Sequence, residues 1–247
     1  MAEDRIYADN ETDDEPFRFN TDVAQVFPDM LRRSIPGYAT SLEAIGSLAA
    51  RYVTAGTNCY DLGCSLGAAT IAMRQGIRVP DCKIFAVDNA PAMIERCEEL
   101  IATDNEAHGS RTPVEILLGD IRDVTITNAT MVVMNYTLQF LDLAGRDALI
   151  QRIFDGLRPG GLFLLSEKVV DTDPHMQTLL VDLHHEHKRR NAYSELEISR
   201  KRAALENVLV PETVAAHRER LDRAGFAHSG VWLRYFNFVS IVAIKSQ

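Results

Sequence analysis

Short apolar runs alternate with segments of helical period from about residue 58 to residue 170. Compact apolar runs bounded by glycine, proline or asparagine indicate buried strands, and apolar spacings of three and four indicate helices. The expected strands are residues 58–63, 82–88, 114–120, 130–135 and 161–168. The expected helices between them are residues 68–75, 91–102 and 144–157. This alternation predicts a parallel sheet with helices on both faces and right-handed crossovers.

The alternation is absent at both ends of the chain. Residues 22–54 form two helical stretches broken at Pro36-Gly37, and residues 173–207 are mostly helical and highly charged. Another helix is expected over residues 211–224, and two final apolar runs follow Gly225 as an antiparallel pair at the sheet edge. We therefore expect one α/β domain over residues 16–247. Its mostly parallel, seven-stranded sheet has an antiparallel final strand, and the helices outside the alternation are lid candidates.

The net charge of −9 is concentrated at the N-terminus. Residues 1–15 hold seven acidic residues against one arginine, and we expect this acidic segment to be a disordered, solvated tail that packs against little. The nearly neutral remainder has no basic stripe, which argues against direct nucleic-acid binding. No apolar run approaches the roughly 20 residues of a membrane span. The acidic start is unlike a signal peptide, so we expect a cytoplasmic location without membrane contact.

The cysteines and histidines do not indicate a metal site. The four cysteines include no C-x-x-C pair, so reduced thiols are expected rather than disulfides or zinc ligands. His184, His185 and His187 form a run in which the first and last share a helix face, but no third ligand accompanies them. A solvated or interface face is the better interpretation, and we expect that catalysis needs no metal.

A glycine loop after the first strand gives the first indication of a ligand. The pattern D-x-G-x-x-x-G spans Asp61 to Gly67 and leads into a helix, so its backbone can turn sharply and approach a ligand closely. It differs from the G-x-G-x-x-G pattern that holds a pyrophosphate, and suits a ribose and a methionyl group instead. Asp61 is either a ligand-site residue or only a turn residue at the strand end.

Three further polar residues stand at strand ends. Asp88 ends the second strand, where a carboxylate accepts hydrogen bonds from both ribose hydroxyls; the alternative is an N-cap for the helix that opens at Pro91. Asp120 ends the third strand and can receive an adenine amino group, or only cap a turn. Asn135 ends the fourth strand. Since open α/β sheets bind ligands at the carboxyl ends of their strands, these residues predict one nucleoside site.

These motifs carry a family resemblance. The strands, glycine loop, ribose acid and LRPGG string resemble class I S-adenosylmethionine-dependent methyltransferases over about residues 56–170, which implies a Rossmann-like fold. Longer strings resemble the carboxy-S-adenosylmethionine synthase family over nearly the whole chain except the acidic segment. They are FPDMLRRSIPGY, YDLGCSLGAAT, DNAPAMIERC, GDIRDV, NYTLQFL and YSELEISRKRAALENV.

The resemblance implies a reaction, a ligand set and partners. S-Adenosylmethionine and prephenate give carboxy-S-adenosylmethionine, phenylpyruvate and water through a sulfonium ylide, and the product supplies a tRNA carboxymethyl-transferring enzyme that modifies the wobble uridine. A homodimer is also implied, and no catalytic base is assigned. The implied contacts to the nucleoside are Tyr38, Gly63, Cys64, Ser65, Asp88, Asn89, Asp120, Ile121, Asn135 and Arg202.

Arg202 depends on the resemblance alone. It is implied as the partner of the product's carboxylate, in the subunit that carries it or across the dimer, whereas its spacing beside Arg200 and Lys201 indicates only solvated surface. Tyr38 likewise has no role without the resemblance.

Two other functions remain as alternatives. An ordinary methyltransferase with a small-molecule acceptor is one, and a non-catalytic S-adenosylmethionine-binding partner of a tRNA-modifying enzyme is the other. NYTLQF stands at Asn135 in place of an N-P-P-Y run, which disfavours methylation of a base amine.

Overall fold

A computed structural model describes residues 2–8, 16–109 and 112–247 of the chain. Its strands are β1 (Asn58–Leu62), β2 (Lys83–Asp88), β3 (Val114–Leu118), β4 (Ala129–Asn135), β5 (Leu157–Val170), β6 (Glu212–Thr213), β7 (His228–Tyr235) and β8 (Phe238–Ile244). They form one sheet in the order β3-β2-β1-β4-β5-β8-β7, with β6 paired to β5. β1 to β5 are parallel, and β8 is antiparallel to both β5 and β7. The mostly parallel sheet and its antiparallel final strand are confirmed, and β6 is an addition to the seven strands expected.

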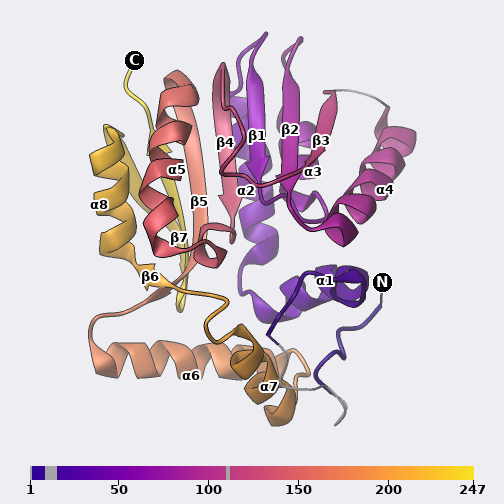
Figure 1. The fold of residues 1–247 in the computed structure, drawn as a ribbon, viewed down its shortest axis with the longest axis vertical. Coiled ribbons are helices and arrows are strands. Elements are labelled where there is room, and N and C mark those ends of the chain that lie inside the picture. Colours follow the sequence, from indigo (N-terminus) through magenta and orange to yellow (C-terminus); the bar gives the residue numbers. More distant parts are fainter. Residues whose placement is uncertain (1, 9–15, 110–111) are drawn as a thin grey trace.

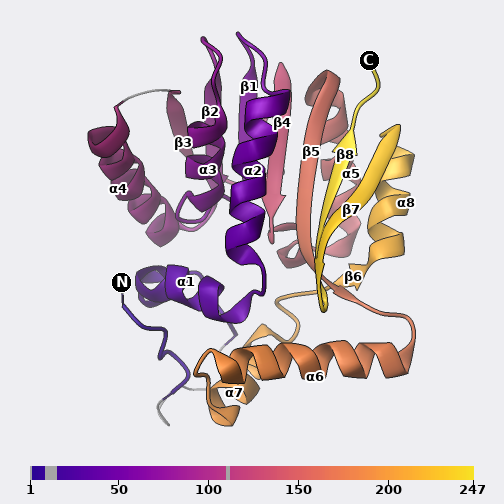
Figure 2. The ribbon, with the colours of Figure 1, turned by 180° about the vertical axis from the view of Figure 1, so that it is seen from behind.

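The helices are α1 (Thr21–Ser34), α2 (Tyr38–Tyr52), α3 (Ala68–Gly76), α4 (Pro91–His108), α5 (Leu143–Gly156), α6 (Pro174–Arg190), α7 (Glu195–Leu205) and α8 (Val214–Ala224). α2, α3 and α4 cover one face of the sheet, and α5 and α8 cover the other (Figures 1 and 2). None of the helices in the described ranges is both long enough and apolar enough to cross a bilayer.

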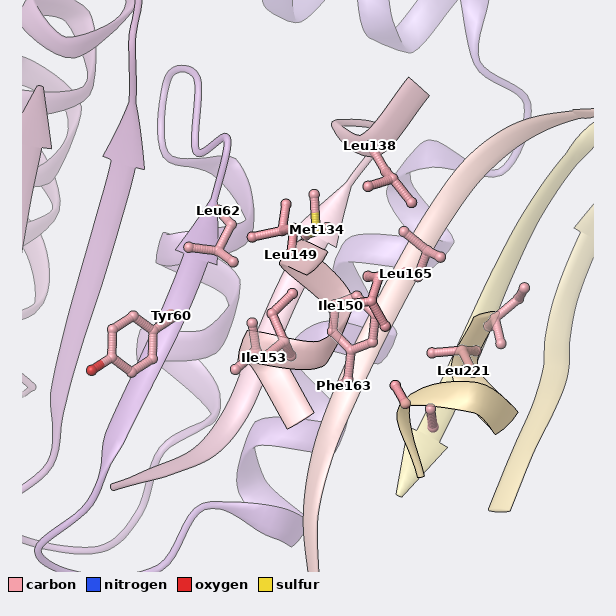
Figure 3. Close-up of a cluster of buried hydrophobic side chains, with 14 of the residues drawn as sticks. Tyr60, Leu62, Met134, Leu138, Leu149, Ile150, Ile153, Phe163, Leu165 and Leu221 are labelled. Atoms are coloured by element: carbon pink, nitrogen blue, oxygen red, sulfur yellow. The ribbon is translucent and has the colours of Figure 1, made fainter. Parts of the chain in front are cut away.

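β4 shows why the central strands appear as continuous apolar runs. Met131 and Val133 pack under α2 and α3, whereas Val132 and Met134 point to the opposite face, toward α5 and α8. Burying each such side chain stabilises the fold by about 1.5–3 kcal/mol. The buried cluster on the face covered by α5 and α8 includes the side chains labelled in Figure 3: Tyr60, Leu62, Met134, Leu138, Leu149, Ile150, Ile153, Phe163, Leu165 and Leu221. All four cysteines are buried and free, in line with the expected reduced thiols.

Three helices lie across the carboxyl ends of the parallel strands. They are α1, α6 and α7, which together form a layer below the sheet in Figures 1 and 2. α2 differs from the rest of the predicted lid segment, residues 22–54, because it packs on α3 and the sheet face instead. A Cβ on Gly76 would lie 2.0 Å from the carbonyl oxygen of Gly46, so two glycines permit this close helix contact.

The expectation of a solvated acidic segment is wrong at Asp4, although Glu3 and Arg5 on either side of it are exposed. Asp4 is only 2% exposed, and its backbone N–H donates to the Asp29 carboxylate at 2.8 Å. The hydroxyl of Tyr193 donates to the Asp4 carboxylate, and the Lys201 ammonium lies 3.6 Å from it. Buried charges are paired in this way because an unpaired carboxylate in the interior is costly. The rest of the acidic segment lies outside the described residues.

Candidate active site

A cavity of about 640 Å³ lies where the strand ends meet α1, α6 and α7. This volume lies within the range of small-molecule sites. Residues from the loops after β1, β2, β3 and β4 line it, together with side chains of α1, α2, α6 and α7. The structure brings nine of the ten predicted contact residues to this cavity: Tyr38, Gly63, Cys64, Ser65, Asp88, Asn89, Asp120, Ile121 and Asn135.

The loop between β1 and α3 turns sharply at the cavity. Gly63 has a φ of 81°, and a Cβ there would lie 2.3 Å from Cγ2 of Thr137, so no larger residue fits. The backbone N–H groups of Gly63 and Cys64 both donate to the carbonyl of Val87, at 2.8 and 2.9 Å. These bonds hold the loop on the end of β2, beside Asp88.

Backbone groups hold the carboxylate of Asp88. Oδ2 accepts the N–H of Ser65 at 2.9 Å, and Oδ1 accepts the N–H of Ala90 at 3.0 Å. Burial raises the pKa of Asp88, while hydrogen bonds from Ala90, Ser65 and Asn89 act in the opposite direction. The N-cap of α4 is Ala90, so the helix-cap alternative for Asp88 is wrong. Because a carboxylate has about four acceptor positions, Asp88 retains lone pairs for a ligand.

Asp61 and Asn135 each place an unpaired oxygen at the cavity. Oδ2 of Asp61 accepts the hydroxyl of Thr70 at 2.6 Å, whereas its Oδ1 has no partner among the described residues. Burial raises the pKa of Asp61 to about 6, against the effect of the Thr70 hydrogen bond. Oδ1 of Asn135 is also buried and unpaired within the described ranges. Leaving a buried acceptor unpaired costs about 1–3 kcal/mol, which a ligand with N–H or O–H donors removes.

Asp120 is paired with Arg122. The backbone N–H of Arg122 donates to Oδ1 at 2.8 Å, and its guanidinium lies 2.7 Å from Oδ2, which lowers the pKa of Asp120. The same guanidinium lies 3.1 Å from Asp142. The turn-capping role is therefore present in the structure. A ligand role for Asp120 and its neighbour Ile121 would be additional to it, since both line the cavity.

An aromatic group near α2 was not predicted. Tyr136 follows β4 with a φ of 66°, and its N–H donates to the carbonyl of Ser166 at 2.8 Å. Its ring meets Phe238 edge-on at 6.0 Å between centroids and lies 6.4 Å from the ring of Tyr38. Burial raises the pKa of both tyrosines, so their hydroxyls stay protonated. Tyr38 thus belongs to an apolar part of the cavity wall.

A second part of the wall, from β5, α6 and α7, carries basic side chains. Lys168, His184, Lys188 and Lys201 line the cavity there. His184 is 5% exposed, and its Nε2 lies 2.9 Å from the carbonyl oxygen of Ser34. Burial, together with neighbouring lysines, lowers the pKa of His184 to about 2, so the ring is neutral. The solvated interpretation is therefore wrong for His184, although its i, i+4 spacing to Lys188 is a signal for a shared face.

The other two histidines of the run are half-buried on α6. Nε2 of His187 lies 3.1 Å from the side-chain amide of Asn191. In residues 2–8, 16–109 and 112–247, no three His, Cys, Asp or Glu side chains are placed to hold a metal ion.

Arg202 is the one predicted contact that lies outside the cavity lining. It is exposed on α7 and has no hydrogen bond or ion pair within the described part of the chain. Its charge adds to burial in lowering the pKa of Lys168 and of His185, so it stands on the basic side of the site. A role across a dimer stays a prediction.

The strand order, the glycine loop and the acid at the end of β2 together define a class I S-adenosylmethionine-dependent methyltransferase fold. The methyltransferase domain family matches residues 60–161. The structure of a putative S-adenosyl-L-methionine-dependent methyltransferase from Methanococcus maripaludis has a TM-score of 0.59 at 21% identity, covering 96% of this chain and 98% of that one. This likeness concerns the fold.

Within that class, the chain belongs to the carboxy-S-adenosyl-L-methionine synthase family. The synthase of Trichlorobacter lovleyi is 54% identical over 242 residues, which cover 98% of each chain. The synthase of Citrifermentans bemidjiense is 55% identical over 229 residues, 93% of each. The family resemblance expected from the sequence strings is therefore confirmed.

Proposed function

We propose that this protein is a carboxyltransferase that converts S-adenosylmethionine and prephenate to carboxy-S-adenosylmethionine, phenylpyruvate and water. The supporting observation is the 54% identity to a synthase of that name along 98% of the chain. In this reaction the sulfonium methyl loses one proton and gains the ring carboxyl of prephenate. The hydroxide that leaves the same ring takes up the proton, so the atoms and charges balance.

The polar residues at the strand ends suit the nucleoside. Asp88 would accept both ribose hydroxyls, and Asp120 and Ile121 would contact the adenine. The unpaired oxygens of Asp61 and Asn135 suit the donors of the methionyl amino group, beside the Gly63 turn that lets the backbone come close. These contacts are proposals that follow from the cavity lining and the donor and acceptor chemistry.

Three phenylalanines that line the cavity, separate from the group around Tyr136, suit the proposed carbanion chemistry. Phe19 meets Phe17 edge-on at 5.0 Å and Phe140 at 5.3 Å, and all three line the cavity. They bring the entry to α1 against the loop after β4. An ylide carbon in contact with water would be reprotonated before it captured a carboxyl group. We infer that this apolar wall excludes water from the sulfonium methyl.

The mass of the nucleoside that copurifies with the protein tests this proposal against the two alternatives. A species heavier than S-adenosylmethionine by the mass of carbon dioxide is expected. S-Adenosylmethionine or S-adenosylhomocysteine alone, together with no carboxylated product on addition of prephenate, would favour an ordinary methyltransferase or a non-catalytic binding protein. Because Asp88→Ala removes the ribose acceptor, that variant should copurify with little nucleoside.

The product is proposed to supply a tRNA carboxymethyl-transferring enzyme acting on the wobble uridine, in the cytoplasm. The nearly neutral remainder of the chain after residue 15, which has no basic stripe, supports a separate tRNA-binding enzyme, because binding the RNA backbone requires positive charge. Deleting the gene should remove carboxymethoxy groups from uridine in hydrolysed tRNA, and unchanged nucleosides would contradict this role. The homodimer is proposed as well, and sedimentation gives its mass directly.

A further inference from the structure

Two lysines in the cavity wall, one buried and one half-buried, have no counter-charge bonded to them among the described residues. Lys188 of α6 is 8% exposed and Lys168 of β5 is half-buried, and both line the cavity. Neither ammonium has a hydrogen bond or an ion pair with any residue of the described ranges. A buried ammonium without a partner is strongly disfavoured. A buried lysine and a half-buried lysine, both unpaired at one cavity, therefore indicate an anionic ligand.

The neighbouring groups do not neutralise these lysines. Of the three lysines at the cavity, Lys201 is the one with partners in the described part of the chain: its ammonium lies 3.6 Å from the Asp4 carboxylate and 3.2 Å from the hydroxyl of Ser34. Asp4 therefore serves Lys201, and the neutral His184 adds no charge of either sign. Burial lowers the pKa of Lys188 to about 7, and the like charges of Lys201 and Lys168 add to this effect, while Asp4 acts in the opposite direction. The cluster thus has more basic than acidic groups, and an anionic ligand would favour the charged form of its lysines.

We propose that Lys168 and Lys188 bind the 2-oxo-acid carboxylate of the second substrate, the one that phenylpyruvate retains. This inference rests on the proposed function, since it assigns a place to the dicarboxylate in that reaction. The two lysines come from β5 and α6, whereas the acids assigned to the nucleoside come from the ends of β1, β2 and β3. The two ligands would therefore occupy chemically distinct parts of one cavity.

The chemistry of the transfer decides which carboxylate the lysines hold. When the ring carboxyl leaves, the electron pair of its C–C bond enters the ring and expels hydroxide, and the carboxyl becomes neutral carbon dioxide. A cation bound to that carboxylate would stabilise the charged ground state and oppose this step. The 2-oxo-acid carboxylate keeps its charge throughout, so two lysines there bind ground state and transition state alike.

Calorimetry with phenylpyruvate tests the assignment without turnover. Lys188→Met and Lys168→Met keep most of the unbranched side chain and remove its charged end. Each should weaken phenylpyruvate binding by at least about tenfold, because a charge-assisted hydrogen bond is lost. The KM for prephenate should rise by a similar factor, while affinity for S-adenosylmethionine stays within about twofold. Lys83→Met is the matched control, since Lys83 is partly exposed and pairs with Glu115 on the sheet.

The free proteins give a second measure. If the lysines serve a ligand rather than the fold, Lys188→Met without ligand should unfold at the same temperature as the parent protein or a higher one, because an unpaired buried charge has been removed. A lower unfolding temperature would indicate a structural role and overturn the proposal.

Other results would separate this proposal from the reaction itself. Loss of S-adenosylmethionine affinity in the lysine variants would assign these lysines to the methionyl carboxylate. Unchanged phenylpyruvate affinity would show that they line the cavity without binding this ligand. Either outcome overturns the assignment while the synthase reaction stands. Lysine-dependent binding of phenylpyruvate in a protein that forms no carboxylated nucleoside would support the anion site and contradict the proposed function.

Discussion

The backbone N–H of Ser65 donates to the carboxylate of Asp88 at 2.9 Å and so joins the loop after β1 to the end of β2. A second backbone donor, the N–H of Ala90, holds the other carboxylate oxygen at 3.0 Å. Both oxygens are therefore fixed before any ligand arrives. Such preorganisation spares a ligand the cost of ordering its acceptor.

Replacing Asp88 with alanine should weaken S-adenosylmethionine binding at least tenfold. Charged hydrogen bonds to the ribose contribute about 1.5–3 kcal/mol each, and every 1.4 kcal/mol is about a factor of ten in affinity. Calorimetry gives the dissociation constant, with Asp155→Ala on the exposed face of α5 as the control. Unchanged affinity would remove Asp88 from the ligand site.

Replacing Gly63 with alanine should destabilise the protein by about 2–4 kcal/mol. The positive φ and the 2.3 Å approach of its Cβ to Thr137 both oppose a side chain. Gly56→Ala is the matched control, because Gly56 has a φ of 72° but no atom within 4 Å of its Cβ position. Chemical denaturation of both variants separates steric overlap from backbone strain, and equal losses would contradict the close contact.

Glu167 should make stability depend on pH. Burial raises its pKa to about 8, although Arg146 and backbone donors oppose the shift, and its Oε2 is unpaired within the described ranges. Between about pH 4.5 and 8 the folded state then binds more protons than the unfolded state, so stability falls as pH rises. Glu167→Gln removes this dependence.

The measurement is the free energy of unfolding of both proteins at about pH 5 and pH 8. From pH 5 to pH 8, the free energy of unfolding of Glu167→Gln should rise relative to that of the parent protein by on the order of 1–3 kcal/mol. Other titrating groups are shared by the two proteins and cancel. A difference that is the same at both pH values would show that Glu167 titrates normally.

Replacing Arg202 with alanine should weaken binding of the carboxylated product more than binding of S-adenosylmethionine. If Arg202 pairs with the added carboxylate, affinity for carboxy-S-adenosylmethionine should fall by roughly 2–4 kcal/mol, while S-adenosylmethionine binding changes far less. Arg202 is exposed and outside the cavity lining in one chain, so its pairing across a dimer stays a prediction beside pairing within its own subunit. Titrating both nucleosides against both proteins decides this. Equal losses would assign Arg202 a supporting role only, and no loss would make it solvated surface.

Local sequence signals were sufficient for most of the sheet and one side of the site. Asp61, Asp88 and Asn135 each end an apolar run, and parallel strands bring such ends to one edge of a sheet. The glycine of the β1 loop is identified by the same argument, and the structure adds only its close contact with Thr137.

The basic side of the site depends on contacts between distant segments. Asp4 lies in a run of acids that by composition belongs in solvent, yet it pairs with Lys201, which comes 197 residues later. His184 and Lys188 stand in a highly charged helix with a weak apolar face, so nothing local indicates burial. Their environment exists only after α6 crosses the carboxyl edge of the sheet.

Incubating the purified protein with prephenate and S-adenosylmethionine that carries a fully deuterated methyl group tests the central claim most directly. Mass spectrometry should show a nucleoside that has gained a carboxyl group and lost one deuterium, formed together with an equal amount of phenylpyruvate. Phenylpyruvate without a carboxylated nucleoside, or S-adenosylhomocysteine with a trideuteromethylated acceptor, would contradict the carboxyltransferase assignment.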